Sequence, residues 1–188
     1  NRYRAIELGL QSTDRVDARV QRRLGAIVLS EGRVEKPDPQ AVASALMAAV
    51  QDMGIDALPW PLSARALRER AHFAGVASLR DDALAERMEQ WLLPLLGKVN
   101  RLRDVAPSGL ANALDNMLGW DTRTRIDQIA PTSFKSPAGT EHHIDYAAEA
   151  GPTVELRVQA LFGLDSHPLV GANRVPLVLS LTSPAGRP

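Results

Sequence analysis

The spacing of apolar residues changes twice along this chain of 188 residues, and this change limits the folds that it can adopt. Apolar and polar residues alternate in part over residues 3–8 and 16–20, which is typical of β-strands. From residue 38 onward the apolar residues recur at three- and four-residue intervals, as in helices, and short β-like runs return after Pro131. We therefore predict an α+β fold with a β segment at 1–36, an all-helical block at 37–130 and a small β-rich domain at 131–188.

The first block contains three β-like runs, at residues 3–8, 16–20 and 24–29, and the last run is followed by Ser30-Glu31-Gly32. Three strands seldom fold alone, so we expect this segment to complete a sheet with another part of the protein. The block carries eight basic and five acidic residues, a net charge of +3, although the whole chain is neutral with 22 of each. Arg22 and Arg23 are therefore candidates for contacts with nucleic-acid phosphates. The alternative is a solvated strand face that protects a sheet edge.

Helix start and stop signals divide the middle block into five predicted helices. The first runs from Asp38-Pro39 to Gly54, the second from Ser63 towards Phe73, and the third from Asp81 or Asp82 past a kink at Pro94. The fourth begins at Ser108, and the fifth runs from Asp121 to Ala130-Pro131. We expect the three tryptophans, Trp60, Trp91 and Trp120, to anchor the helical core.

The third block contains β-like runs at 132–135, 142–146, 153–156 and 175–181, separated by turns at 137–139 and 151–152. Residues 158–162 fit either a strand or one helical turn. Pro176 places the last run at a sheet edge or near a strand start. Short strands with one small helix suit a small barrel of the oligonucleotide-binding type.

The loop at 135–140 and the following strand hold the strongest candidates for a binding site. A lysine, small hydroxyls and a glycine amide are groups that contact a sugar–phosphate backbone, which singles out Lys135, Gly139 and His142. Phe134 and Tyr146 flank the loop, and we expect both to point inward, which leaves the loop without an aromatic platform. The alternative is an ordinary hairpin.

Other chemistry has less support in the sequence. His143 and Asp145 would share one strand face and offer half of a metal site or a general-base pair, but no third ligand is suitably spaced. We therefore expect a structural role for this pair and no bound metal. The sequence has no cysteine, no apolar run long enough for a bilayer, and neither G-x-x-x-x-G-K-[ST] nor D-E-x-H. We expect a cytoplasmic chain with no membrane contact, and no ATPase motor within these residues.

Six segments resemble, in the same order, the region behind the motor of bacterial HrpB-type ATP-dependent helicases, a DEAH-like family. They are RLGAIVL at 23–29, DALPW at 56–60, WLLP at 91–94, PTSFKSPAGTEHHIDY at 131–146, VQALFG at 158–163 and RVPLVLSLTSPAGRP at 174–188. In this family two RecA-like motor domains precede accessory helical and β-rich domains. The resemblance therefore implies the C-terminal accessory region of a larger helicase, without its basic, aromatic-rich C-terminal extension.

This resemblance implies that the chain alone is not an enzyme and holds no cofactor, since ATP and Mg²⁺ would bind to the motor domains of the parent protein. The implied partners are those motor domains and, weakly, single-stranded nucleic acid, with RNA as the expected strand. The neutral net charge instead favours a protein-interaction module that does not bind nucleic acid directly. Both interpretations stay open from the sequence.

Overall fold

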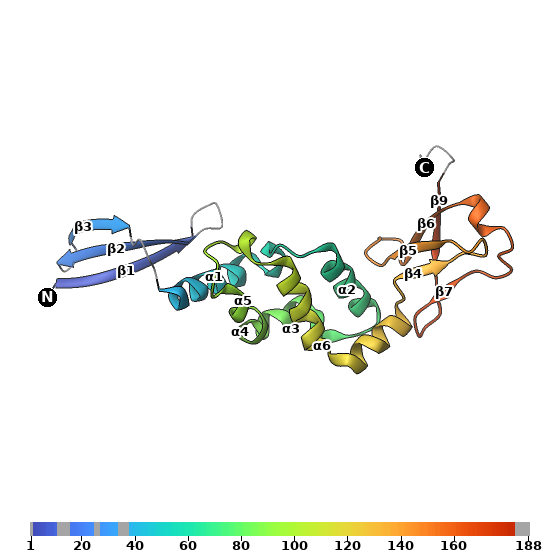
Figure 1. Cartoon of the computed structure of the whole chain (residues 1–188), viewed down its shortest axis with the longest axis horizontal. Helices are drawn as coiled ribbons and strands as arrows, with labels where there is room; N and C mark the ends of the chain where they lie inside the picture. The colour runs from blue at the N-terminus through green and yellow to red at the C-terminus, as the bar shows by residue number, and fades with distance from the viewer. Residues whose placement is uncertain (1, 11–15, 25–26, 34–37, 183–188) are drawn as a thin grey trace. The chain divides into compact units, whose positions relative to one another are not determined.

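The computed structural model describes residues 2–10, 16–24, 27–33 and 38–182 (Figure 1). Contacts within the chain define two compact units. The first comprises residues 1–61 and 81–117, and the second comprises 62–80 and 118–188. Each unit mixes helices with strands, as the predicted α+β class requires. Whether the blocks 1–36, 37–130 and 131–188 behave as separate domains stays a prediction.

The N-terminal strands of the first unit lie side by side in an antiparallel sheet of order β1-β2-β3 (Figure 1). The strands are β1 (Arg2–Leu10), β2 (Val16–Leu24) and β3 (Ile27–Arg33). The predicted single strand at 24–29 is wrong, because Leu24 ends β2 and Ile27 begins β3. Ser30 does not end the last strand either, because the pairing of β3 with β2 continues to Arg33.

The helices of the first unit largely follow the predicted signals. Helix α1 (Pro39–Met53) begins at Asp38, whose carboxylate accepts hydrogen bonds from the amides of Gln40 and Ala41, and ends at Gly54. The short helix η1 (Ile55–Ala57) follows. Such capping satisfies amides that have no partner within the helix, and Gly54 tolerates its positive φ of 86°.

The predicted third helix is divided into α3 (Asp81–Glu86), α4 (Met88–Trp91) and α5 (Leu93–Leu96). Arg87 departs from helical geometry, and Pro94, which lacks an amide hydrogen, lies in the first turn of α5. The division therefore goes further than the single kink expected at Pro94. The short helix η3 (Leu102–Asp104) follows.

The predicted fourth and fifth helices are the two parts of α6 (Pro107–Ile129), which are separated by Gly119 with φ 69° and ψ 169°. Gly119 lies close to the boundary between the two units. Trp60 and Trp91 anchor the core of the first unit, with ring centroids 5.7 Å apart. The prediction is wrong for Trp120, which directly follows the break in α6 and is 82% exposed.

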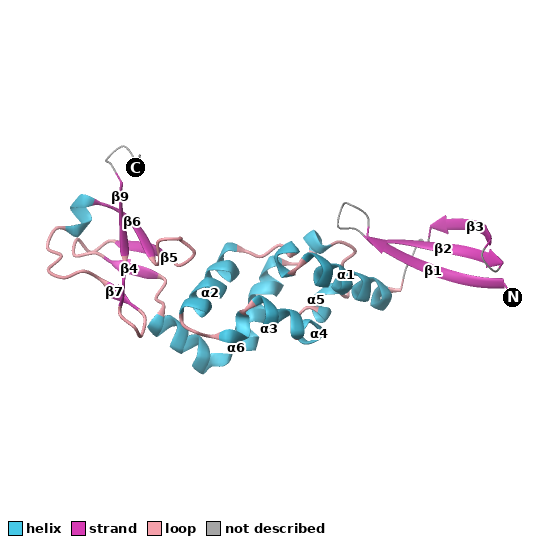
Figure 2. Ribbon diagram, turned by 180° about the vertical axis from the view of Figure 1, so that it is seen from behind, coloured by secondary structure: helices cyan, strands magenta, loops and turns pink. Residues whose placement is uncertain are grey.

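The second unit contains α2 (Leu62–Phe73), η2 (Ala77–Leu79), the part of α6 after Leu118 and the C-terminal strands. Its four-stranded sheet has the order β4-β5-β6-β9, and the last two strands are parallel (Figure 2). The strands are β4 (Ser133–Lys135), β5 (Glu141–Asp145), β6 (Thr153–Arg157) and β9 (Val178–Thr182). Among the described strands this sheet is open, so the predicted barrel is not closed.

The predicted strand at 175–181 is divided between two sheets. Its first residues form β8 (Val175–Pro176), which pairs with β7 (Leu169–Val170), a strand that the sequence did not predict. Residues 158–162, which fitted either a strand or one helical turn, contain the helical turn η4 (Val158–Leu161). The core of the unit contains Ile144, Val154, Leu156, Ala160, Val170 and Leu177, with Phe73 of α2 packed against it.

Candidate nucleic-acid interface

The loop between β4 and β5 is held in one conformation by its own hydrogen bonds. The Ser136 amide donates to the Thr140 carbonyl, and the Gly139 amide donates to the Ser136 carbonyl, both at 2.9 Å. The buried Ser136 Oγ lies 2.8 Å from Thr140 Oγ1, which lies 2.8 Å from His142 Nε2. The shape of the loop is therefore set without a ligand, which lowers the entropic cost of binding one.

These bonds change the expected roles of two candidate residues. Gly139 has φ 84°, a conformation that favours glycine, but its amide already has an acceptor inside the loop. Its contribution to a site would therefore be the turn itself. Half-buried His142 uses Nε2 within the loop, which leaves Nδ1 as the ring nitrogen for a ligand. Lys135 ends β4, pairs in register with Glu141 and is exposed.

The five predicted site residues divide between the two units. Lys135, Gly139 and His142 lie together in the β4–β5 hairpin of the second unit. Arg22 and Arg23 lie in β2 of the first unit, where the pairing with β3 shifts register between them. Their side chains lie outside the description, so a phosphate-contacting role for them stays a prediction.

A hollow of about 450 Å³ lies beside the loop. Leu156 and Ala160 are buried and form its apolar part, while most of the remaining lining side chains are polar. The lining residues are Ala138, Thr140, His142, Glu155, Leu156, Arg157, Gln159, Ala160 and Thr182. The sequence analysis identified only the loop side of this hollow and missed Arg157 and Gln159.

Phe162, at the end of η4, is also a residue that the sequence analysis missed. Its side chain is 69% exposed, whereas Phe134 and Tyr146 pack against the core, as expected for these two residues. Gly163, the next residue, approaches the loop, because a Cβ placed on it would lie 3.7 Å from Pro137 Cβ. The helical turn is the feature that would have indicated this exposure, because it buries Ala160 and leaves Val158 and Phe162 exposed.

The other face of β5 carries His143 and Asp145, both exposed. Asp145 Oδ1 accepts a hydrogen bond from the Ala147 amide at 2.9 Å, which is a turn contact. In the part of the chain that the structure describes, no group of three or more histidine, aspartate or glutamate side chains is arranged to hold a metal ion. Nearby, burial and then the charge of Asp145 raise the pKa of Glu69.

The hairpin is fixed to the helices through the segment that joins α6 to β4. Four successive carbonyls, from Ile129 to Thr132, each accept a hydrogen bond from a different part of the unit. Their donors, in order, are the Gly171 amide at 2.9 Å, Arg70 Nε at 2.6 Å, Tyr146 Oη at 2.8 Å and the Ile144 amide at 3.0 Å.

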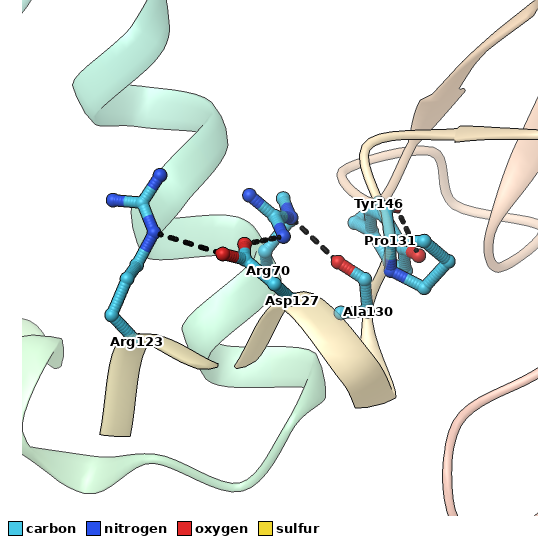
Figure 3. A network of polar contacts seen from close by, with 6 residues as sticks. All are labelled: Arg70, Arg123, Asp127, Ala130, Pro131 and Tyr146. Atoms are coloured by element: carbon cyan, nitrogen blue, oxygen red, sulfur yellow. Dashed lines mark hydrogen bonds and ion pairs between the residues drawn. The ribbon is translucent and has the colours of Figure 1, made fainter. Parts of the chain in front are cut away.

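Arg70 of α2 is the charged member of this network (Figure 3). Its side chain is 4% exposed, and its Nη2 lies 2.5 Å from Asp127 Oδ1. A cation at the end of α6 also complements the negative end of the helix dipole. Burial raises the pKa of Tyr146 to about 12, and the charge of Arg70 opposes this shift. These contacts hold the start of β4 against α2.

No helix in the described part of the chain is both long enough and apolar enough to cross a membrane. The chain matches a family model described as the ATP-dependent helicase C-terminal domain over residues 91–188, just over half of its length. It is also 30% identical over 173 residues to the ATP-dependent RNA helicase HrpB of Escherichia coli K12. That match covers 88% of this chain and 21% of the relative.

Two solved structures cover the whole chain. A crystal structure of the E. coli DExH-box NTPase HrpB matches with a TM-score of 0.73 and 27% identity, over 24% of that protein's chain. A second crystal structure, of the E. coli DEAH/RHA helicase HrpB, matches with a TM-score of 0.69 and 26% identity, over 25% of its chain. The chain thus spans only about a quarter or less of the relatives that it matches. By sequence and by fold, the chain belongs to the family formed by the C-terminal regions of HrpB-type ATP-dependent helicases.

Proposed function

We propose that this chain is the accessory region of an ATP-dependent RNA helicase and that its β4–β5 hairpin contacts single-stranded RNA. The relative matched over most of the chain is an ATP-dependent RNA helicase, and ATP with Mg²⁺ would act in motor domains of the same polypeptide. The accessory region would bind RNA weakly in the cytoplasm while those domains hydrolyse ATP. The chain itself would carry out no reaction.

The observation that supports this function most is the preset hairpin, which carries exposed Lys135 and places Thr140 and His142 in the lining of a hollow. Phosphate contacts position a protein on nucleic acid without reading its sequence, and a lysine ammonium suits that role. Arg22 and Arg23 would add phosphate contacts from the first unit. The open sheet would then bind RNA as an oligonucleotide-binding domain does, across strand faces and loops.

The test is fluorescence anisotropy of a labelled single-stranded RNA titrated with the 188-residue chain at low and at physiological salt. We expect binding that weakens with salt, and we expect Lys135→Glu to weaken it and to lower the salt slope by about one phosphate contact. The matched control is Lys98→Glu, which makes the same charge change at an exposed position of the first unit. Equal effects of the two substitutions would refute a specific role for the hairpin.

A second function is supported by the exposed apolar side chains. Leu62 and Trp120 are 85% and 82% exposed in the second unit, and such residues often mark protein contacts. In this case the chain would dock a protein partner and not touch RNA. RNA binding that is absent at low salt, together with salt-insensitive binding of a protein partner, would favour this alternative.

A further inference from the structure

The aromatic residues around the C-terminal strands are unequally exposed, and the exposed one marks a candidate binding surface. Phe73, Phe134 and Tyr146 pack against the core, whereas Phe162 is 69% exposed. Two further exposed apolar side chains lie nearby in the chain or sheet, Val158 at 46% and Leu181 at 48% exposed. Leu181 pairs in register with Leu156, which lines the hollow. An apolar edge therefore adjoins the hollow.

Two observations place the backbone of residues 162–163 near the hollow and the β4–β5 loop. The Phe162 amide donates to the carbonyl of Gln159 at 3.3 Å, and Gln159 lines the hollow. On its other side, Gly163 lies against Pro137 of the loop. Phe162 therefore lies close in the chain to the lining of the hollow, and the residue after it lies close to the preset loop.

We propose that Phe162 is a stacking platform for one base of single-stranded RNA, with the attached sugar and phosphate lying over the adjoining hollow. This inference rests on the proposed function and adds its recognition chemistry. An exposed aromatic ring stacks on any base because every base has a π-face, and the binding is therefore tolerant of sequence.

The groups around the hollow fit the rest of a nucleotide. Arg157 and Gln159 carry donors suited to phosphate and ribose oxygens, and His142 keeps Nδ1 for the same purpose. Lys135 adds a second cation at the start of the loop. In the lining the charge of Arg157 balances that of Glu155, and Lys135 of the loop is paired in register with Glu141, so the donor groups and not a net charge suit a nucleotide.

The test compares Phe162 variants by anisotropy with single-stranded RNA and with the same RNA carrying one abasic site. Because base–aromatic stacking contributes about 1–3 kcal/mol per base, Phe162→Ala should weaken binding by about 5- to 150-fold. Phe162→Tyr and Phe162→Trp should bind nearly as well as the original chain. Phe162→Leu separates stacking from simple apolar contact, since leucine is apolar but has no ring.

The abasic RNA, tested with the lost base placed at each position in turn, completes a double-mutant cycle. Removing the stacked base should weaken binding to the original chain but not weaken binding to Phe162→Ala any further. The dependence of RNA affinity on salt concentration should be the same for Phe162→Ala as for the original chain, whereas Lys135→Glu should weaken this dependence. Leu169→Ala, which truncates an exposed apolar side chain elsewhere in the second unit, is the matched control and should have little effect. Far-UV circular dichroism establishes that each variant is folded.

Three results would overturn the proposal, and they are distinguishable. RNA binding that is unchanged in Phe162→Ala would refute the stacking role while leaving the proposed function intact. Full binding by Phe162→Leu would show that an apolar contact suffices. No RNA binding by the original chain, even at low salt, would refute both the stacking role and the proposed function.

Discussion

Replacing Arg70 with methionine should loosen the attachment of the hairpin to the helices. Methionine keeps most of the apolar stem in the buried position but removes both polar contacts, those with the Ala130 carbonyl and with Asp127. A buried carbonyl left without a donor costs about 1–3 kcal/mol. The lost ion pair adds up to about 1 kcal/mol, because the Asp127 side chain is 51% exposed and regains water. The expected total is about 1–4 kcal/mol.

The matched control is Arg123→Met. Arg123 Nε lies 3.5 Å from the same Asp127 carboxylate, but the Arg123 side chain is 36% exposed and the pair is an ordinary i,i+4 contact on a helix surface. Removing such a pair costs about 0.3–0.5 kcal/mol. Each substitution removes one cation from the same carboxylate, but only Arg70→Met also removes the donor to the buried Ala130 carbonyl.

Hydrogen exchange measured by mass spectrometry resolves the two units, which a single unfolding curve does not. The amides of Ile144 and Gly171 donate to the carbonyls of Thr132 and Ile129, so peptides that contain them report on the joining segment. A loss of about 1–4 kcal/mol corresponds to exchange about 5- to 700-fold faster in Arg70→Met. Peptides covering 84–92 of the first unit should not change. Equal exchange in Arg70→Met and Arg123→Met would refute the role assigned to Arg70.

Three further predictions concern the second unit. Gly171→Ala should destabilise it by more than Gly151→Ala in denaturant unfolding, because both positions have positive φ but only at Gly171 would a Cβ meet the Phe73 ring, at 2.9 Å. Glu69→Gln should raise the free energy of unfolding at pH 7 but not below about pH 4.5. The pKa of Glu69 is raised, so its ionisation destabilises the fold as pH increases through that pKa. The chain has two tyrosines, so a Tyr3→Phe variant isolates the absorbance of Tyr146. Its absorbance at 295 nm should show Tyr146 ionising near pH 12, and the free energy of unfolding should fall from about pH 10 upward. Equal losses of stability in the two glycine variants would contradict the first prediction. A stability difference for Glu69→Gln that is as large at pH 4 as at pH 7 would contradict the second. A tyrosine midpoint near pH 10 in a folded chain would contradict the third.

Local signals in the sequence were sufficient for much of the fold. Asp38, Pro39 and Gly54 act within a few residues of themselves, and the helix between them has the predicted bounds. The strands β4, β5 and β6 likewise follow from alternation and from the turns between them. Such features depend on neighbours along the chain, which periodicity and capping describe well.

Features that depend on distant contacts could not be predicted in this way. Nothing near Arg70 in the sequence indicates that its guanidinium is buried and bonded to Ala130, 60 residues away. Trp120 shows the opposite error, because a large apolar residue at a helix start was expected in a core and is exposed. The division of the run at 175–181 depends on the pairing of β8 with β7, which is itself too short to recognise.

The candidate site was predicted only in part for the same reason. The hairpin residues Lys135, Gly139 and His142 are close in sequence and were found together. Phe162 joins them as a candidate because the next residue, Gly163, approaches Pro137 of the loop, which is a proximity between separate segments. The exposed aromatic side chain therefore became a candidate only in the folded chain.

Photocrosslinking tests the central claim, that the β-rich unit contacts RNA through this surface, most directly. A single-stranded RNA containing 4-thiouridine is irradiated with the 188-residue chain, and the crosslinked peptides are identified by mass spectrometry. Our account predicts adducts within residues 135–142 and 157–163, and fewer of them in Phe162→Ala. Adducts confined to other segments, or none under conditions where the RNA is bound, would contradict it.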